Sequence, residues 1–187
     1  MEDDAMKEKI KIALVYGSTR PGRFCDTVAG WTAAELEKRG GFEVLKIDPA
    51  QPGGEGDGAL GTRIAEADAF VVVTPEYNHG YPAALKSLID SFGPEWHAKP
   101  VGFVSYGGVS GGLRAVEQLR LVFAELHAVT LRDSVSFQSP WEQFDSAGGL
   151  RAPERAQRSL DTMLGRLEWW AGALRRARTE VPYLAAA

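Results

Sequence analysis

The sequence predicts an α/β protein built on a five-stranded parallel sheet with helices on both faces. Short runs of β-branched and apolar residues alternate along the chain with segments of helical periodicity. Several of the runs are apolar at almost every position, which is typical of strands buried on both faces of a parallel sheet. Glycine and proline separate the segments. Because each strand is followed or preceded by a helix, we expect right-handed crossover connections.

The first strand is expected at Ile10–Tyr16, where an apolar run ends at a glycine. A helix over residues 24–39 follows and stops at a glycine pair, since glycine favours helix ends. The second strand is expected at Phe42–Ile47. Residues 48–58 are dense in glycine and proline, so we expect a loop there and predict that it is the most mobile segment.

The rest of the chain continues the alternation. The expected elements are a short helix over 62–67, a strand over 69–74, a helix over 82–92, a strand over 101–106, a helix over 113–126, a strand over 129–137 and a helix over 153–177. The last helix carries an apolar stripe, which predicts one buried face: Leu160, Met163, Leu164, Leu167, Trp170, Ala171 and Leu174. A chain of 187 residues fits one domain (1–187), with a core over about 10–177 and a C-terminal tail over 178–187.

The composition argues against several classes of protein. A net charge of −4 disfavours a nucleic-acid binder or a membrane-surface binder, because both need a basic face. No apolar stretch approaches the roughly 20 residues of a membrane span. The acidic, polar start has no apolar core of a secretory signal, so we expect a cytoplasmic protein. The single cysteine, Cys25, suits a reducing compartment, and one cysteine with three histidines gives no zinc-ligand spacing, so no metal site is expected.

Three loops follow predicted strands at the edge where parallel α/β sheets bind their ligands. The first, GSTRPGRF, has the glycine spacing of a nucleotide-phosphate loop, but Arg23 and Phe24 replace the lysine and hydroxyl residues that hold Mg-ATP. Ser18, Arg20, Arg23 and the start of the next helix remain as donors for an unreactive phosphate. The alternative is an ordinary turn with solvated arginines, and this loop alone favours neither reading.

The second loop, PEYNHGYPAALK, follows the third predicted strand. Tyr77 and Tyr81 offer aromatic surface for the face of a flat heterocycle, and the turn formers Asn78 and Gly80 leave backbone amides for its polar edge. Packing within the loop or a subunit contact is the alternative role for the tyrosines. We assign Glu76 a positional role, because the sequence places no acid–base partner near it.

The third loop, SYGGVSGG, has four glycines in six residues after the fourth predicted strand. Glycine leaves the φ angles free, so this backbone can lie flat against a ligand. The helix that opens after Gly112 would present its positive end to the same place. A flexible surface turn is the alternative, but it does not explain why the glycines stand at a strand end. The three loops together are more specific than any one of them.

GSTRPGR, TPEYNHGYPAALK and SYGGVSGGLRAVEQLR resemble the signature segments of the NAD(P)H-dependent FMN reductase family, over roughly residues 10–137. The resemblance implies a flavodoxin-like fold with strand order 2-1-3-4-5. It also implies tightly bound FMN, NAD(P)H as co-substrate and a small electron acceptor, namely a quinone, a flavin, an azo compound or a metal oxyanion. The first loop would then bind a phosphate that never reacts and needs no magnesium.

The resemblance further implies which residues contact FMN. Ser18, Arg20, Arg23 and Phe24 would hold the phosphate; Pro75, Glu76, Tyr77 and Asn78 would lie along the isoalloxazine ring; and Ser105, Tyr106, Gly107 and Gly108 would close its far side. Many relatives carry serine and asparagine where this chain has Arg23 and Cys25, so the contact at Cys25 is expected through the backbone. No catalytic residue is predicted, because the flavin supplies the chemistry.

We expect a ping-pong oxidoreductase, in which NAD(P)H and the acceptor use the same face of the flavin in turn. Two alternatives stay open: a flavodoxin-type electron carrier, and an FMN reductase that supplies reduced flavin to a monooxygenase. The resemblance implies a homodimer or a dimer of dimers. Tyr81 and Trp96 are expected to expose apolar surface beside the flavin, which a second subunit would cover.

Overall fold

The computed structural model describes residues 9–51 and 58–186. Most of the 48–58 loop lies outside the described residues, and so does the prediction about its mobility. No helix in the described ranges is both long enough and apolar enough to cross a membrane.

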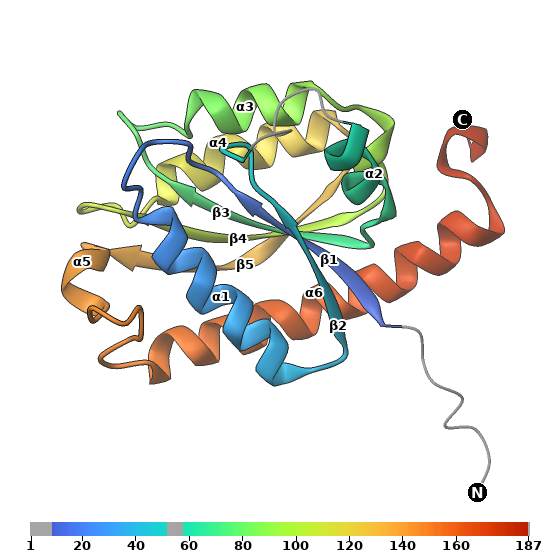
Figure 1. The fold of residues 1–187 in the computed structure, drawn as a ribbon. Coiled ribbons are helices and arrows are strands. Elements are labelled where there is room, and N and C mark those ends of the chain that lie inside the picture. The colour runs from blue at the N-terminus through green and yellow to red at the C-terminus, as the bar shows by residue number, and fades with distance from the viewer. Residues whose placement is uncertain (1–8, 52–57, 187) are drawn as a thin grey trace, which may run out of the picture.

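Five parallel strands form one sheet in the order β2-β1-β3-β4-β5 (Figure 1). The strands are β1 Ile10–Tyr16, β2 Phe42–Ile47, β3 Ala69–Pro75, β4 Pro100–Gly107 and β5 Val129–Gln138. The predicted fold class and strand order are therefore confirmed. The predicted ends of the strands differ from the observed ends by at most one residue.

Helices cover both faces of the sheet. They are α1 Cys25–Arg39, α2 Gly58–Glu66, α3 Ala83–Asp90, α4 Leu113–Glu125, α5 Pro140–Gln143 and α6 Glu154–Glu180, with 3₁₀ turns η1 at Pro94–Trp96 and η2 at Tyr183–Ala186. Figure 1 shows α1 and α6 on one face and α2, α3 and α4 on the other. The sequence analysis missed α5, η1 and η2, because each is too short to show a period of apolar residues.

Two apolar cores lie on the two faces of the sheet. Under α1 and α6, Leu14, Trp31 and Met163 are among the buried residues. Five of the seven residues of the predicted α6 stripe are buried, in line with the expected single buried face. Under α2, α3 and α4, large rings such as Phe70 and Phe123 fill the second core.

The expectation that Trp96 exposes apolar surface beside the site is wrong. Its side chain is fully buried, with ring centroids 4.6 Å from Phe70 and 5.5 Å from Phe123. The indole Nε1–H donates a 3.1 Å hydrogen bond to the Ile89 carbonyl. With its polar atom satisfied, tryptophan can be buried completely. Tyr81 packs only partly against the same core.

The strand order reverses between β1 and β3, and ligands of open α/β sheets bind beyond the carboxyl ends of the strands at such a point. Gly17 allows β1 to leave the sheet there. A Cβ at this position would stand 2.7 Å from the Val73 carbonyl oxygen, which accepts the Gly17 N–H at 2.8 Å. The loops after β1, β3 and β4 therefore meet at one edge of the sheet.

Candidate functional site

The loop after β1 turns sharply before α1. Arg23 N–H donates to the Arg20 carbonyl at 3.2 Å, and Gly22 supplies the positive φ of 64° that the turn requires. Helix α1 then begins at Cys25 with no side-chain cap. Its first N–H groups and its positive dipole end thus face the loop, which is the arrangement that favours an anion.

Arg23 also lies in this loop, but its guanidinium N–H groups donate to carboxylates of the protein. Nη1 and Nη2 bind Asp48 at 2.8 and 2.7 Å, Nε binds Asp26 at 2.9 Å, and Nη1 also donates to the Ser18 carbonyl. The Arg23 side chain is 8% exposed and that of Asp48 is 2% exposed. Burial raises the pKa of Asp48, but hydrogen bonds from Arg23 and Ala50 outweigh it and hold that pKa below its ordinary value. Arg23 therefore links the loop to the end of β2.

Ser18, Arg20 and Tyr77 come together from two loops. The Ser18 and Tyr77 hydroxyls are 2.8 Å apart, and the Ser18 side chain is buried. The Arg20 guanidinium lies 3.5 Å above the centre of the Tyr77 ring. Among the described residues no carboxylate pairs with Arg20. This exposed, pre-oriented cation is the one that can receive an anionic group.

Tyr77 and Gly80 close a tight turn after β3, with mutual backbone hydrogen bonds of 2.9 and 3.0 Å. Asn78 and His79 between them have φ angles of 52° and 70°, as a two-residue hairpin turn requires. Gln118 on α4 donates to the His79 carbonyl at 2.8 Å. The turn is thus held to the helix, while the Asn78 side chain is exposed at the site.

Glu76 connects this segment to the start of α4. Its carboxylate accepts hydrogen bonds from the Ser110 hydroxyl at 2.6 Å, from the Arg114 N–H at 3.1 Å and from Arg114 Nε at 2.5 Å. Burial raises the pKa of Glu76, but these bonds outweigh it, so the pKa lies below its ordinary value. A carboxylate held ionised in this way is a poor general base, which supports the positional role expected from the sequence.

The end of β4 and the glycine-rich loop after it present backbone, because the side chains of Ser105 and Tyr106 at the strand end point inward. The Ser105 hydroxyl donates to the Gly111 carbonyl at 2.9 Å. Tyr106 is buried in the core, where burial and the neighbouring Cys25 raise the pKa of its phenol. A Cβ at Gly107 would lie 3.3 Å from Gly112 N, whereas one at Gly108 would meet no protein atom within 4 Å. Gly108 therefore has an open face.

Phe24 and Cys25 also turn their side chains into the protein. The Phe24 ring lies 5.8 Å from Phe144 and 6.2 Å from Tyr106. The Cys25 thiol is fully buried 3.8 Å from the Val73 carbonyl oxygen, and burial raises its pKa. Both residues therefore have only their backbone available to the site, and the backbone contact expected at Cys25 stays a prediction. The sequence analysis missed Phe144 and Asp48, since neither lies in a recognisable motif.

The donor set at this edge suits a phosphate joined to a flat ring. A hydroxyl, an exposed guanidinium and a helix N-terminus face one place, and the 75–78 segment and the open glycine backbone lie beside it. Within residues 9–51 and 58–186, no group of three or more His, Cys, Asp and Glu residues could hold a metal ion.

Comparison with known proteins agrees with this arrangement. Residues 10–142 match the model of the family described as NADPH-dependent FMN reductase. The chain is 37% identical over 130 residues to an NAD(P)H-dependent FMN reductase of Schizosaccharomyces pombe, covering 60% of this chain and 65% of that protein. It is 39% identical over 113 residues to an NAD(P)H:quinone oxidoreductase of Solanum tuberosum, covering 57% of this chain and 58% of that protein.

The chain thus spans about three fifths of the length of these two relatives. Among solved structures, the flavoenzyme NAD(P)H:(acceptor) oxidoreductase FerB of Paracoccus denitrificans superposes with a TM-score of 0.68 at 21% identity, over 89% of this chain and 98% of that one. That likeness shows a shared fold. The family match covers the whole sheet and all three loops, so the resemblance seen in the sequence is confirmed: the chain belongs to the NADPH-dependent FMN reductase family.

Proposed function

We propose that this protein is an FMN-dependent oxidoreductase that takes a hydride from NAD(P)H and reduces a quinone or another small acceptor. The observation that carries the proposal is the meeting of Ser18, Arg20 and Tyr77 beside the open backbone of Gly108. The names of the yeast and potato relatives, an FMN reductase and a quinone oxidoreductase, support the same chemistry.

Ser18, Arg20 and the N-terminus of α1 hold the phosphate in this proposal. Arg20 carries the decisive charge, because its guanidinium is exposed and already oriented by the Tyr77 ring. Arg23 shapes the loop through Asp48 and contacts the phosphate at most by its backbone. Phe24 and Cys25 likewise contribute backbone N–H groups.

The ring would lie between two backbone segments. Residues 75–78 would line one edge, and residues 105–108 would close the far side, where Gly108 allows close approach. Glu76 fixes the distance between the segments by holding Ser110 and Arg114. The start of α4 also faces this side, and its dipole favours negative charge on the bound group.

Bound FMN would supply the hydride and electron-transfer chemistry, so the chain would need no acid–base residue of its own. The protein orients the ring and leaves one face of it for NAD(P)H and the acceptor in turn. A G-x-G-x-x-G spacing occurs at residues 56–61, but it does not directly follow a strand, as the motif of a separate dinucleotide site requires. Because NAD(P)H would have to leave this shared place before the acceptor binds, the mechanism would be ping-pong.

The visible spectrum of the purified protein tests the proposal first. We expect a yellow protein with about one FMN per chain, whose absorbance is bleached by NADPH or NADH without oxygen and restored by a benzoquinone. A colourless protein that does not bind added FMN would refute it. Bleaching only after addition of a separate reductase would identify an electron carrier, and flavin lost during purification would favour a reductase that releases reduced FMN.

We also propose that the active form is a homodimer or a dimer of dimers, and that the chain works in the cytoplasm as a single domain. Val109 is 90% exposed and Trp141 is 59% exposed, and they follow β4 and β5 at the edge that carries the site. A second subunit over this edge would cover both side chains. Sedimentation at micromolar concentration tests this, and a fully active monomer would exclude it.

A further inference from the structure

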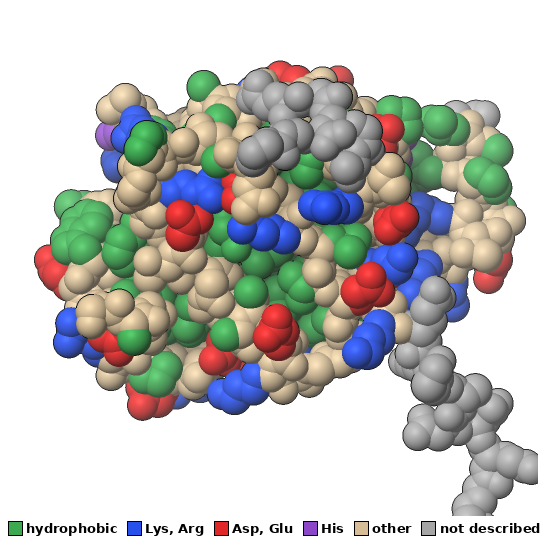
Figure 2. Space-filling view, in the orientation of Figure 1, with side chains coloured by type: hydrophobic (Ala, Val, Ile, Leu, Met, Phe, Trp, Pro, Cys, Tyr) green, Lys and Arg blue, Asp and Glu red, His purple; other side chains and the backbone are tan. Residues whose placement is uncertain are grey.

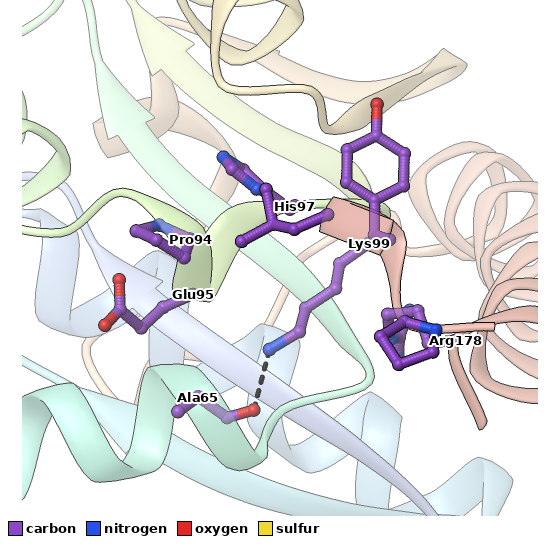
Figure 3. Close-up of a pocket in the computed structure, with 9 residues that line it drawn as sticks. Ala65, Pro94, Glu95, His97, Lys99 and Arg178 are labelled. Carbon is purple, nitrogen blue, oxygen red and sulfur yellow. Dashed lines mark hydrogen bonds between the residues drawn. The ribbon is translucent and has the colours of Figure 1, made fainter. Parts of the chain in front are cut away.

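A pocket lies at the edge of the sheet opposite the candidate cofactor site. Its cavity of about 470 Å³ is bounded by the end of α2, by η1 and by the C-terminal segment after α6 (Figure 3). Lys99 directly precedes β4, and Ala65 lies in the last turn of the helix before β3. Parallel strands start at a common edge, so this pocket is at the amino edge, whereas the cofactor loops are at the carboxyl edge.

Lys99 supplies a buried positive charge to the pocket. Its side chain is only 6% exposed, and Nζ donates to the Ile64 and Ala65 carbonyls at 2.9 and 2.7 Å. An ammonium group has three N–H donors, and these two acceptors are neutral carbonyls at the end of α2. The charge of Lys99 is therefore only partly compensated by the groups bonded to it.

Arg178 adds a second cation beside Lys99. Its Nη1 donates to the Ala98 carbonyl at 2.5 Å, and its Nη2 lies 3.5 Å from Asp68. Asp68 also accepts a hydrogen bond from the Lys11 N–H at 3.0 Å and pairs with Arg175 at 3.2 Å, so its charge is shared. Burial, followed by the charge of Arg178, lowers the pKa of Lys99 to about 8.

The rest of the lining is apolar or aromatic. Tyr183 and Leu184 from the C-terminal segment line the pocket with Pro94 and Pro182. The Tyr183 ring lies 5.7 Å from that of His97, and its hydroxyl is 2.9 Å from His127 Nδ1. Among the described residues, His97 Nδ1 is the one buried side-chain polar atom without a hydrogen-bond partner. A ligand with one polar end and one flat or apolar end matches this lining.

We propose that this pocket binds a small organic monocarboxylate, whose carboxylate pairs with Lys99 and Arg178 and whose flat or apolar body lies against Tyr183 and Leu184. Glu95, which also lines the pocket, disfavours a dianion such as phosphate by its own charge. The volume lies within the roughly 300–1,000 Å³ usual for small-molecule sites. The proposal does not depend on the proposed flavin chemistry, because the two sites lie at opposite edges of the sheet.

Benzoate is the probe, titrated into the full chain as purified and followed by calorimetry. We expect one saturable site per chain, unchanged flavin content and visible spectrum, and binding at least about tenfold weaker in Arg178→Met and in Tyr183→Ala. Arg176→Met is the matched control: it removes the same charge from the same helix at an exposed position and should leave binding unchanged. Thermal unfolding of each variant shows whether it is folded. Lys99→Met is included in the titrations only if its unfolding transition shows that it is folded.

Benzamide, the neutral counterpart, should bind at least about tenfold more weakly than benzoate, and inorganic phosphate should not compete. The charged groups that face Lys99 are Arg178 on α6, Asp68 before β3 and Glu95 on η1, with His97 and Tyr183 as the other titratable lining groups. A bound carboxylate favours protonated Lys99, so binding takes up a proton. Affinity should therefore be steady below about pH 8 and fall towards tenfold per pH unit above it.

Non-saturable binding overturns the proposal, and so does equal binding of benzoate and benzamide. Unchanged affinity in both Arg178→Met and Tyr183→Ala overturns it too. Displacement of flavin by benzoate would place the probe at the other edge and would also overturn it. None of these results bears on NAD(P)H oxidation, so failure here leaves the proposed oxidoreductase activity intact.

Discussion

Two arginines three residues apart in the loop after β1 have different surroundings. Arg23 is buried and bound by two carboxylates, whereas Arg20 is exposed and lies over the Tyr77 ring. The same residue type therefore stabilises the loop at one position and faces the candidate phosphate position at the other. Substitution of each arginine should separate effects on stability from effects on binding.

Arg20→Ala should weaken FMN binding with little loss of stability. It removes a charge-assisted contact worth roughly 1.5–3 kcal/mol, which corresponds to about a tenfold to hundredfold loss of affinity. Fluorescence titration of FMN measures the affinity, and thermal unfolding of the flavin-free chain provides the control. Unaltered affinity would mean that Arg20 is a solvated turn residue.

Arg23→Ala should destabilise the flavin-free protein by about 1.5–3 kcal/mol, because the buried Asp48 carboxylate loses its charged hydrogen bonds and, among the described residues, keeps only Lys46 at 3.4 Å and the Ala50 N–H as partners. Urea unfolding measures this loss. A loss below about 1 kcal/mol, as found for exposed ion pairs, would contradict a structural role for the pair.

The same pair should make stability depend on pH. The pKa of Asp48 is lower in the folded chain than its ordinary value of 3.8, so its contribution is complete above that value and is lost as the pH falls below it. The gap in stability between wild type and Asp48→Asn should therefore narrow between pH 6 and pH 3. A gap that stays constant over this range would argue against the pairing.

Gly108→Ala should reduce FMN affinity about tenfold or more while leaving the flavin-free chain as stable as wild type. A Cβ there meets no protein atom within 4 Å, so only a bound ring can obstruct it, and overpacking typically costs about 1–3 kcal/mol. Gly30→Ala in α1 is the matched control, because its Cβ also meets nothing and lies outside the site. Normal FMN affinity in Gly108→Ala would place the ring elsewhere.

At the scale of elements, hydrogen bonds connect the segment after β3 to helix α4. Glu76 follows β3 and holds Ser110 and Arg114 at the start of α4, while Gln118 on α4 holds the turn at His79. Gly112 has a φ of 87°, and a Cβ at this position would stand 2.7 Å from the Cβ of Ser105. A residue with a side chain therefore cannot replace Gly112 unless the loop shifts. The backbone segment after β3, beside the proposed ring, is thus held to the helix by hydrogen bonds.

Glu76→Gln should weaken FMN binding several-fold and lower the unfolding temperature, because the amide cannot accept all the hydrogen bonds that the carboxylate accepts. The effect should shrink as the pH falls below the ordinary glutamate value of 4.5, since the pKa of Glu76 is lowered in the folded state. Glu117→Gln, on the exposed face of α4, is the control and should change neither quantity. Equal effects of the two substitutions would remove the special role of Glu76.

At the scale of the whole molecule, the fold places two different surfaces at the two ends of one sheet. The carboxyl edge carries the open cofactor loops, and the amino edge carries the pocket beneath the C-terminal segment (Figure 1). Acidic and basic side chains are interspersed over the face seen in Figure 2, without a large area of one sign. That distribution agrees with the small net charge and gives little long-range attraction for a charged polymer.

The proposed shared binding place for NAD(P)H and the acceptor predicts the steady-state kinetics. We expect parallel lines in a two-substrate matrix of NADPH against a benzoquinone, and comparable efficiencies with simple quinones, ferricyanide and an azo dye. Apolar contacts discriminate by only about 1–3 kcal/mol per methylene-sized difference, so an open ring face selects weakly among acceptors. Intersecting lines would show a ternary complex and a separate nucleotide site.

Features that depend on neighbouring residues in the sequence could be predicted, whereas features that depend on distant residues could not. Strand runs, glycine breaks and the apolar stripe of α6 are local patterns, so the sheet and its helices could be predicted to within a few residues for most elements. Helix α2 was predicted four residues short at its start, beside the glycine-rich loop. Trp96 was misplaced because its burial depends on Phe70 and Phe123, which approach it only after the chain folds.

By itself the sequence determined the α/β class, the family and the place of three loops at the carboxyl edge of the sheet, because apolar period, glycine position and motif spacing are properties of neighbouring residues. Only the tertiary structure decided which side chains of those loops face the site. Asp48 is 25 residues from Arg23 and Tyr77 is 59 residues from Ser18, and they meet because β2 and β3 both pair with β1. Such pairing binds Arg23 to Asp48 and leaves Arg20 exposed at the candidate site, since a buried guanidinium must satisfy its charge within the protein.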